Sequence, residues 1–182
     1  MPSATNLLIT GLPRSGKTTL IKRILQVDSV RKRAGGFITE EIRKKGERIG
    51  FQIMTVPEGR TGLLARIGHT SSYRVGRYGV DIAKLEEMAC PAILGAKAQN
   101  CLIVVDEIGK MELFSRTFRS VLLDVLDSPN RLIGTIMDRP DAFADSIKQR
   151  PDVRLLFLDR KNGDDVFQET LDWLDKPSMF CL

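Results

Sequence analysis

The sequence is poor in histidine and cysteine. His69 is the only histidine, and the three cysteines, Cys90, Cys101 and Cys181, lie far apart along the chain. A single histidine gives no basis for a histidine-based triad or metal cluster. An odd number of widely spaced cysteines lacks both the paired spacing of a zinc site and the even count of a disulfide scaffold. We therefore expect reduced thiols that mostly serve packing.

Long hydrophobic runs are also missing. No apolar stretch reaches the roughly 18 residues that a membrane span requires. The first six residues, MPSATN, lack the charged and apolar regions of a signal peptide. We expect no membrane partner, no export and a cytoplasmic location.

The composition is that of an ordinary folded protein. The chain has 182 residues, of which 42% are hydrophobic and 28% charged, and this length fits one domain. A net charge of +5 favours an anionic partner but does not distinguish a nucleotide from a nucleic acid. The densest basic run, Arg31-Lys32-Arg33, is more typical of a solvated helix end or loop than of a nucleic-acid contact.

Apolar periodicity alternates between strand and helix along most of the chain. Such alternation predicts an α/β fold with a largely parallel central sheet flanked by helices. The expected strands are 6–10, 101–105, 131–136 and 153–158, and the expected helices are 17–27, 82–100 (interrupted at Pro91), 113–126, 142–149 and 165–175.

The middle third of the chain follows a different pattern. Residues 36–82 contain short β-prone runs at 37–39, 49–56, 63–67 and 73–80, separated by Gly-rich or charged turns. This pattern predicts a β-hairpin-rich insertion between the first helix and strand 101–105. Its arginines could neutralise phosphate, bind a polyanion or face water, and they are Arg60, Arg66, Arg74 and Arg77.

One motif with specific chemistry follows the first predicted strand. Residues 11–18 match G-x-x-x-x-G-K-[ST], the P-loop or Walker A motif. The glycines let backbone N–H groups turn toward phosphate, the lysine places a charge on the β and γ phosphates, and the threonine offers a hydroxyl to Mg²⁺. The following helix adds its positive end. The predicted nucleotide-binding residues of this loop are Gly11, Leu12, Pro13, Arg14, Ser15, Gly16, Lys17 and Thr18.

Arg14 departs from the usual pattern, because this loop position often holds glycine or another small residue. We expect its side chain to point outward, although it could also place a cation near the phosphates.

An acidic pair follows the predicted central strand. Asp106 and Glu107 come directly after four aliphatic residues, at the carboxyl end of a buried parallel strand, where ligands bind in open α/β sheets. Asp106 is expected to hold Mg²⁺ together with Thr18, as a Walker B aspartate does. Glu107 is expected to orient the attacking water and, with Lys17, to be catalytic.

Two further residues are weaker candidates. Thr135 ends the next apolar strand, where a polar side chain could sense the γ phosphate. Lys110 could supply positive charge to the transition state. A structural role is an equal alternative for each.

The stretch VVDEIGKMELFS at 104–115 resembles a signature of a small nucleoside-triphosphatase family of thermophiles and archaea, whose vertebrate member is cancer-related nucleoside-triphosphatase. GFITEEIR at 36–43, RIGF at 48–51 and RVGRYGVD at 74–81 resemble its other signatures. The resemblance implies a RecA-like P-loop fold and slow hydrolysis of ATP, GTP, CTP and related nucleotides with little base selectivity. It also implies a nucleotide site that adds to the P-loop the residues Leu102, Ile103, Val104, Val105, Asp106, Glu107, Ile108 and Gly109.

The expected partners are therefore nucleoside triphosphates, with Mg²⁺ as cofactor and the protein as a monomer. Two alternatives stay open. A nucleotide or nucleoside kinase shares the P-loop, and arginines of the insertion could then clamp an acceptor. A nucleotide-switched nucleic-acid-binding module would use the basic charge, although this partner is not favoured.

Overall fold

The computed structural model describes residues 4–176, which form an α/β fold around one nine-stranded sheet. The strand order is β5-β6-β4-β3-β2-β7-β8-β1-β9. Five neighbouring strands pair in parallel, namely β9 (Val153–Phe157), β1 (Asn6–Thr10), β8 (Leu132–Ile136), β7 (Leu102–Ile108) and β2 (Ala34–Lys44). We call these strands the parallel half of the sheet.

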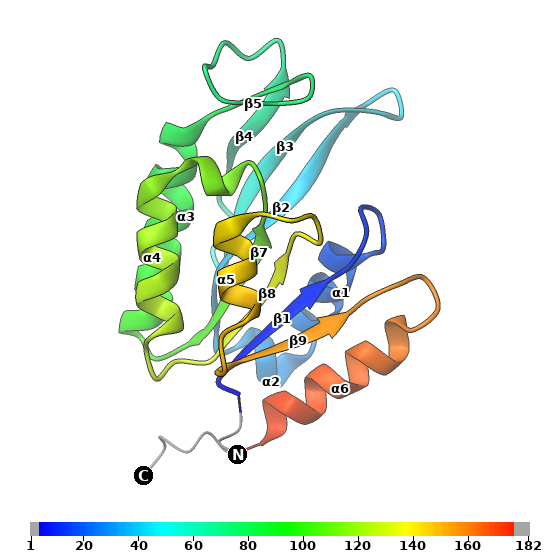
Figure 1. The fold of residues 1–182 in the computed structure, drawn as a ribbon, viewed down its shortest axis with the longest axis vertical. Coiled ribbons are helices and arrows are strands. Elements are labelled where there is room, and N and C mark those ends of the chain that lie inside the picture. The colour runs from blue at the N-terminus through cyan, green and yellow to red at the C-terminus, as the bar shows by residue number, and fades with distance from the viewer. Residues whose placement is uncertain (1–3, 177–182) are drawn as a thin grey trace.

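The remaining strands continue the same sheet with antiparallel pairing. They are β3 (Glu47–Val56), β4 (Thr61–Ile67), β6 (Tyr78–Val80) and β5 (Arg74–Val75). These strands, which we call the antiparallel half, extend to the top of Figure 1, away from β1 and β9.

Helices cover both faces of the parallel half (Figure 1). One face packs against α1 (Lys17–Leu25), α2 (Asp28–Arg31) and α6 (Gly163–Asp175), and the other against α3 (Ile82–Ala98), α4 (Arg116–Leu126) and α5 (Ala142–Lys148). Side chains along β1 point alternately to the two faces of the sheet: Leu7 and Ile9 pack on the α1 side, and Leu8 packs on the α3 side. A strand buried on both faces explains the continuous apolar runs in the sequence.

Polar side chains fix where the helices of the α3 side begin. Asp81 accepts a hydrogen bond from Lys84 N at 2.9 Å and caps α3, and Ser115 accepts one from Phe118 N at 2.9 Å and caps α4. Asp141 accepts bonds from the first amides of α5 at 3.0 Å. Each cap pairs an N–H group that would otherwise lack a partner at the helix start.

Arg131, which precedes β8, closes the carboxyl end of α6. Its guanidinium lies 3.9 Å from the centre of the Trp173 ring and donates hydrogen bonds to the carbonyls of Trp173, Leu174 (3.0 Å) and Lys176 (2.9 Å). Trp173 is buried, as a packing anchor should be. One cation therefore pairs the free carbonyls of the helix end and covers an aromatic face.

The structure corrects four details of the expected pattern. The predicted insertion does not begin at residue 36 as a separate unit, because the first residues of β2 pair in parallel with β7. The helix expected from 113 is split into a 3₁₀ turn, η1 (Glu112–Phe114), and α4, because Ser115 caps α4. Helix α3 continues through Pro91, which is exposed, and the short helix α2 was not predicted.

Two of the three cysteines lie in the part of the chain that the structure describes. Cys90 is buried and Cys101 half-buried, both as free thiols, and Cys181 lies outside the described residues. The pKa of the Cys90 thiol is raised to about 11, mainly by burial and also by the charge of Glu86. Within residues 4–176, no helix is long and apolar enough to cross a membrane.

Candidate functional site

The predicted P-loop joins the carboxyl end of β1 to the start of α1. Gly11 lies against the residue that follows β9, since a Cβ added at Gly11 would sit 2.2 Å from Leu158 O. Gly16 has φ of +100° and directly precedes α1. Because α1 starts at Lys17, its positive end is directed at the loop, as an anion site requires.

Arg14 occupies a backbone conformation that explains why this position often holds glycine. Its φ is +67°, in the left-handed region that costs a non-glycine residue roughly 1 kcal/mol. The residue is exposed, as the sequence predicted. The loop thus keeps its shape despite an unfavourable residue at one position.

Lys17 lies between the loop and the acidic pair. Its ammonium donates a hydrogen bond to Gly11 O at 3.0 Å and lies 3.6 Å from Glu107 Oε1. The side chain is only 11% exposed. A buried lysine held at the mouth of a phosphate loop can bind the charge of a triphosphate.

The register of β7 brings both members of the acidic pair to this end of the sheet. Asp106 pairs with Ile38 of β2, but the pairing with β8 is irregular between Val105 and Ile108. Side chains of neighbouring strand residues normally point to opposite faces, and an irregularity of this kind changes their directions. Asp106 consequently faces Thr135 while Glu107 faces Lys17.

Asp106 is fully buried among polar groups. Thr135 Oγ1 donates a hydrogen bond to Asp106 Oδ1 at 2.5 Å, and Asp106 Oδ2 has no hydrogen-bond partner. The pKa of Asp106 is raised to about 6, mainly by burial and also by the charge of Glu107. The hydroxyls of Thr135 and Thr18 and the backbone of Thr39 act in the opposite direction. A buried carboxylate oxygen without a partner next to Thr18 suits a cation.

This arrangement fits the Mg²⁺ that the motif implies. Mg²⁺ prefers oxygen ligands and usually takes one or two from the protein, with the rest from phosphates and water. Thr18 and Asp106 supply such oxygens. Residues 4–176 hold no group of three or more His, Cys, Asp or Glu side chains that could bind a metal by themselves. The ion would therefore depend on phosphate oxygens for the rest of its coordination.

Glu107 differs from its neighbour in accessibility. Its side chain is 34% exposed, whereas Asp106 is 0% exposed. A carboxylate that reaches solvent beside the lysine can contact a water molecule, and a buried one cannot. The two adjacent carboxylates are therefore suited to different tasks.

The sequence alone did not lead us to expect a role for one acidic residue near the site, Glu112. Glu112, at the start of η1, is buried, and its Oε2 would lie 3.0 Å from a Cβ added at Gly109. The sequence did contain a signal, because Glu112 stands between the apolar residues Met111 and Leu113.

The structure does not bring all predicted site residues to the loop. Leu102, Ile103, Val104 and Val105 are buried in the hydrophobic core on both sheet faces. Ile108 is also buried in the core, and Lys110 is exposed at the turn after β7. The arginines expected in the insertion, at 60, 66, 74 and 77, are exposed. Arg31, Lys32 and Arg33 are exposed at the end of α2.

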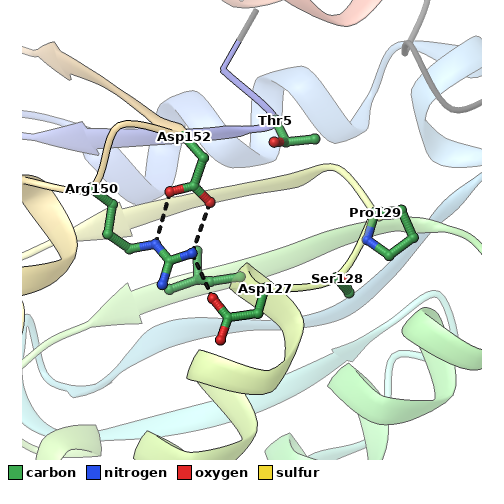
Figure 2. A pocket seen from close by; sticks show the side chains of 7 residues that line it. Thr5, Asp127, Ser128, Pro129, Arg150 and Asp152 are labelled. Atoms are coloured by element: carbon green, nitrogen blue, oxygen red, sulfur yellow. Dashed lines mark hydrogen bonds and ion pairs between the residues drawn. The ribbon is translucent and has the colours of Figure 1, made fainter. Parts of the chain in front are cut away.

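A pocket lies away from this site, at the amino ends of β1 and β9 (Figure 2). Arg150 donates hydrogen bonds to both carboxylate oxygens of Asp152 at 2.9 Å and to Asp127 at 2.7 Å. The only arginine that lines the pocket is thus already paired with two carboxylates. The remaining lining residues are Thr5, Leu126, Ser128 and Pro129.

Strand order and site together define the class of this protein. One strand, β8, separates the P-loop strand β1 from the Walker B strand β7, and a glutamate directly follows the Walker B aspartate. This is the RecA-like arrangement of P-loop nucleoside triphosphatases.

Comparisons with known proteins identify the family. The model of the NTPase family matches residues 6–171. Nucleoside-triphosphatase THEP1 of Thermotoga sp. (strain RQ2) is 45% identical over 92% of this chain and 94% of its own. Human cancer-related nucleoside-triphosphatase is 37% identical over 87% of this chain and 90% of its own. The chain belongs to the NTPase family and is a nucleoside-triphosphatase.

Solved structures support the same conclusion. The crystal structure of THEP1 from Aquifex aeolicus matches with a TM-score of 0.85 and 37% identity, covering 94% of this chain and 99% of that one. The solution structure of the human cancer-related nucleoside triphosphatase matches with a TM-score of 0.80 and 33% identity, covering 93% and 97%.

Proposed function

We propose that this enzyme slowly hydrolyses ATP, GTP, CTP and other nucleoside triphosphates to the diphosphate and phosphate, with Mg²⁺ as cofactor. The observation that carries the proposal is the contrast between Asp106, which is buried beside Thr18, and Glu107, which is accessible beside Lys17. A pure phosphotransferase needs no carboxylate to orient water, and this site has one.

In the proposed mechanism, Lys17 and the loop amides hold the β and γ phosphates. Thr18 and Asp106 would hold Mg²⁺, which would supply positive charge against the negative charge that develops on the phosphates. Glu107 orients a water molecule in line with the γ phosphate and accepts its proton. The water oxygen forms a bond to phosphorus, the bond to the β–γ bridging oxygen breaks, and the diphosphate leaves with that electron pair.

The loop after β9 supports little base selectivity. Asn162 Oδ1 accepts a hydrogen bond from Asp159 N at 2.8 Å, and Asn162 Nδ2 donates one to Phe157 O at 2.9 Å. Asp159 Oδ1 in turn accepts from the amides of Lys161 and Asn162. This loop lies next to Gly11, and these polar atoms are already engaged with its own backbone, so they are poorly placed to distinguish bases.

The decisive experiment replaces Glu107 by Gln, which keeps the size of the side chain but removes the proton acceptor. We expect phosphate release to fall by about 100-fold or more, while nucleotide affinity changes little. Phosphate release and fluorescent-nucleotide binding would be measured with and without Mg²⁺ over a panel of triphosphates. Glu47→Gln, at an exposed residue of β3, is the matched control. Undiminished turnover in Glu107→Gln would remove Glu107 from the mechanism.

The kinase alternative predicts a different product. Labelled ATP incubated with nucleosides and nucleoside monophosphates should then label an acceptor instead of free phosphate. The monomeric state and the cytoplasmic location expected from the sequence stay predictions.

A further inference from the structure

We propose that Glu112 is a positioning residue that acts through Glu107, by fixing the turn that follows β7 and so the direction of the Glu107 carboxylate. The inference rests on the proposed role of Glu107 in orienting water. Glu112 itself contacts neither phosphate nor water in this proposal.

The burial of Glu112 is the first observation. Among residues 4–176, Asp106 and Glu112 are the buried acidic residues, and both lie at the carboxyl end of β7. Acidic side chains are almost never fully buried unless they are paired, because burial of a carboxylate is costly. Asp106 is explained by the expected cation, whereas the hydrolytic mechanism gives Glu112 no task.

Contacts at Gly109 link Glu112 to Glu107. A Cβ added at Gly109 would lie 3.0 Å from Glu112 Oε2 and 3.5 Å from Glu107 Cδ and Cγ. The two side chains therefore border the same face of one glycine. Leu113 N donates a hydrogen bond to Gly109 O at 3.0 Å and closes the turn. A change in the Glu112 side chain would reach Glu107 through this turn.

The charge state of Glu112 is compatible with its position near Glu107. The pKa of Glu112 is raised to about 8, mainly by burial and also by the charges of Glu107 and Asp106. Backbone N–H groups of Glu112 and Gly109 partly oppose this shift. Near pH 7 the side chain is mostly a neutral acid, so it can support Glu107 without adding a second negative charge.

The 3₁₀ turn that carries Glu112 is itself held in place from outside. Ser115 donates a hydrogen bond to Glu86 Oε1 at 2.6 Å, and Arg119 Nε donates one to Leu113 O at 2.6 Å. The Phe114 and Tyr73 rings pack with centroids 5.3 Å apart. Glu112 thus projects from a fixed base toward the turn of Gly109.

The test compares four variants with the wild-type enzyme in steady-state phosphate release with Mg-ATP. Glu112→Ala removes the support, and we expect kcat to fall about 10- to 100-fold while KM changes less than about twofold, because misplacement of a catalytic group affects the chemical step. Glu112→Gln has the same shape and no charge, so we expect it to restore kcat to within about threefold of the wild type.

Ser128→Ala is the matched control, because it removes a side-chain hydrogen bond, to Val125 O at 2.7 Å, just beyond the opposite end of α4. An equal loss of kcat in Ser128→Ala and Glu112→Ala would overturn the inference. An unchanged kcat in Glu112→Ala, or a Gln variant as slow as the Ala variant, would also overturn it.

Glu107→Gln is measured in the same assay and separates the two proposals. If Glu107→Gln loses turnover while Glu112→Ala keeps it, only the positioning role fails. If Glu107→Gln keeps turnover, the proposed mechanism fails and the positioning role fails with it.

Discussion

The two halves of the sheet differ in how deeply their charged side chains are buried. At the carboxyl ends of the parallel half, the protein buries Asp106, Glu112 and most of Lys17. In the antiparallel half, charged residues stay near the surface, and some of them form pairs. Arg48 is an example, since it lies 2.8 Å from Glu41 Oε1, donates to Tyr78 Oη at 3.2 Å and covers the Phe51 ring.

This difference indicates where buried charge lowers the stability of the fold. Burying charge destabilises a fold unless binding or catalysis requires it, whereas exposed pairs cost and contribute little. We therefore expect the parallel half to hold the chemistry and the antiparallel half to add packing and surface. Strand β2 belongs to both, because it pairs with β7 in its first residues and with β3 along its length.

The largest contrast is expected between Lys17→Ala and Arg48→Ala. Lys17→Ala removes the buried ammonium at the P-loop, and we expect kcat/KM to fall at least about 100-fold. Arg48→Ala removes a partly exposed pair, and we expect activity within about twofold of the wild type and a stability loss below about 1 kcal/mol. Phosphate release and urea unfolding would measure both. A large activity loss in Arg48→Ala would show that the antiparallel half takes part in the reaction.

An intermediate effect is expected for Arg131→Ala, at the amino end of the parallel half. The change removes the hydrogen bonds to the carboxyl end of α6 and the contact with Trp173. We expect the free energy of unfolding to fall by about 1–3 kcal/mol, with kcat preserved. Lys32→Ala, at an exposed residue, is the control in urea unfolding. A loss of kcat would mean that both ends of the parallel half serve catalysis.

The smallest effect concerns Asp152 in the pocket of Figure 2. Burial alone would raise the pKa of Asp152, but the Arg150 guanidinium and the Asn6 amide hold it below its usual range. A lowered pKa in the folded state adds stability above the unfolded pKa of about 3.9, and this stability is lost as the pH falls through the folded value.

Asp152→Asn should therefore destabilise the protein at pH 7 by less than about 1 kcal/mol and by still less near pH 3. Urea midpoints of the variant and of wild type at the two pH values would measure this difference. Glu58→Gln, at an exposed turn, is the control. A deficit that grows toward acidic pH would reverse the sign and contradict the ion-pair explanation.

Local patterns in the sequence predicted the fold class and the family, and both are confirmed. The P-loop and the strand before Asp106 were recognisable because each depends on a short run of residues: glycines next to Lys17, and aliphatic residues that both sheet faces bury. The roles assigned to Lys17, Thr18, Asp106 and Glu107 stay predictions, although the structure brings all four side chains to one end of the sheet.

Other features depend on contacts between distant segments, which no local pattern encodes. The parallel pairing of β2 with β7 joins residues about seventy positions apart, so a run of β-prone residues near 37 predicted only a hairpin. Glu112 was missed, although apolar residues flank it, because its burial also requires η1 to pack against α3 and β7. Leu102 to Val105 were expected at the site through family resemblance, but their burial follows from helices on both sides of β7.

The position of Lys17 has a consequence for how a triphosphate binds. Its ammonium already has two oxygen neighbours, Gly11 O at 3.0 Å and Glu107 Oε1 at 3.6 Å. An incoming phosphate must compete with both, so binding at this nitrogen is an exchange of partners. The same exchange would release Glu107 from the lysine as the substrate arrives, so that uptake of the phosphate and liberation of the water-orienting carboxylate become one event.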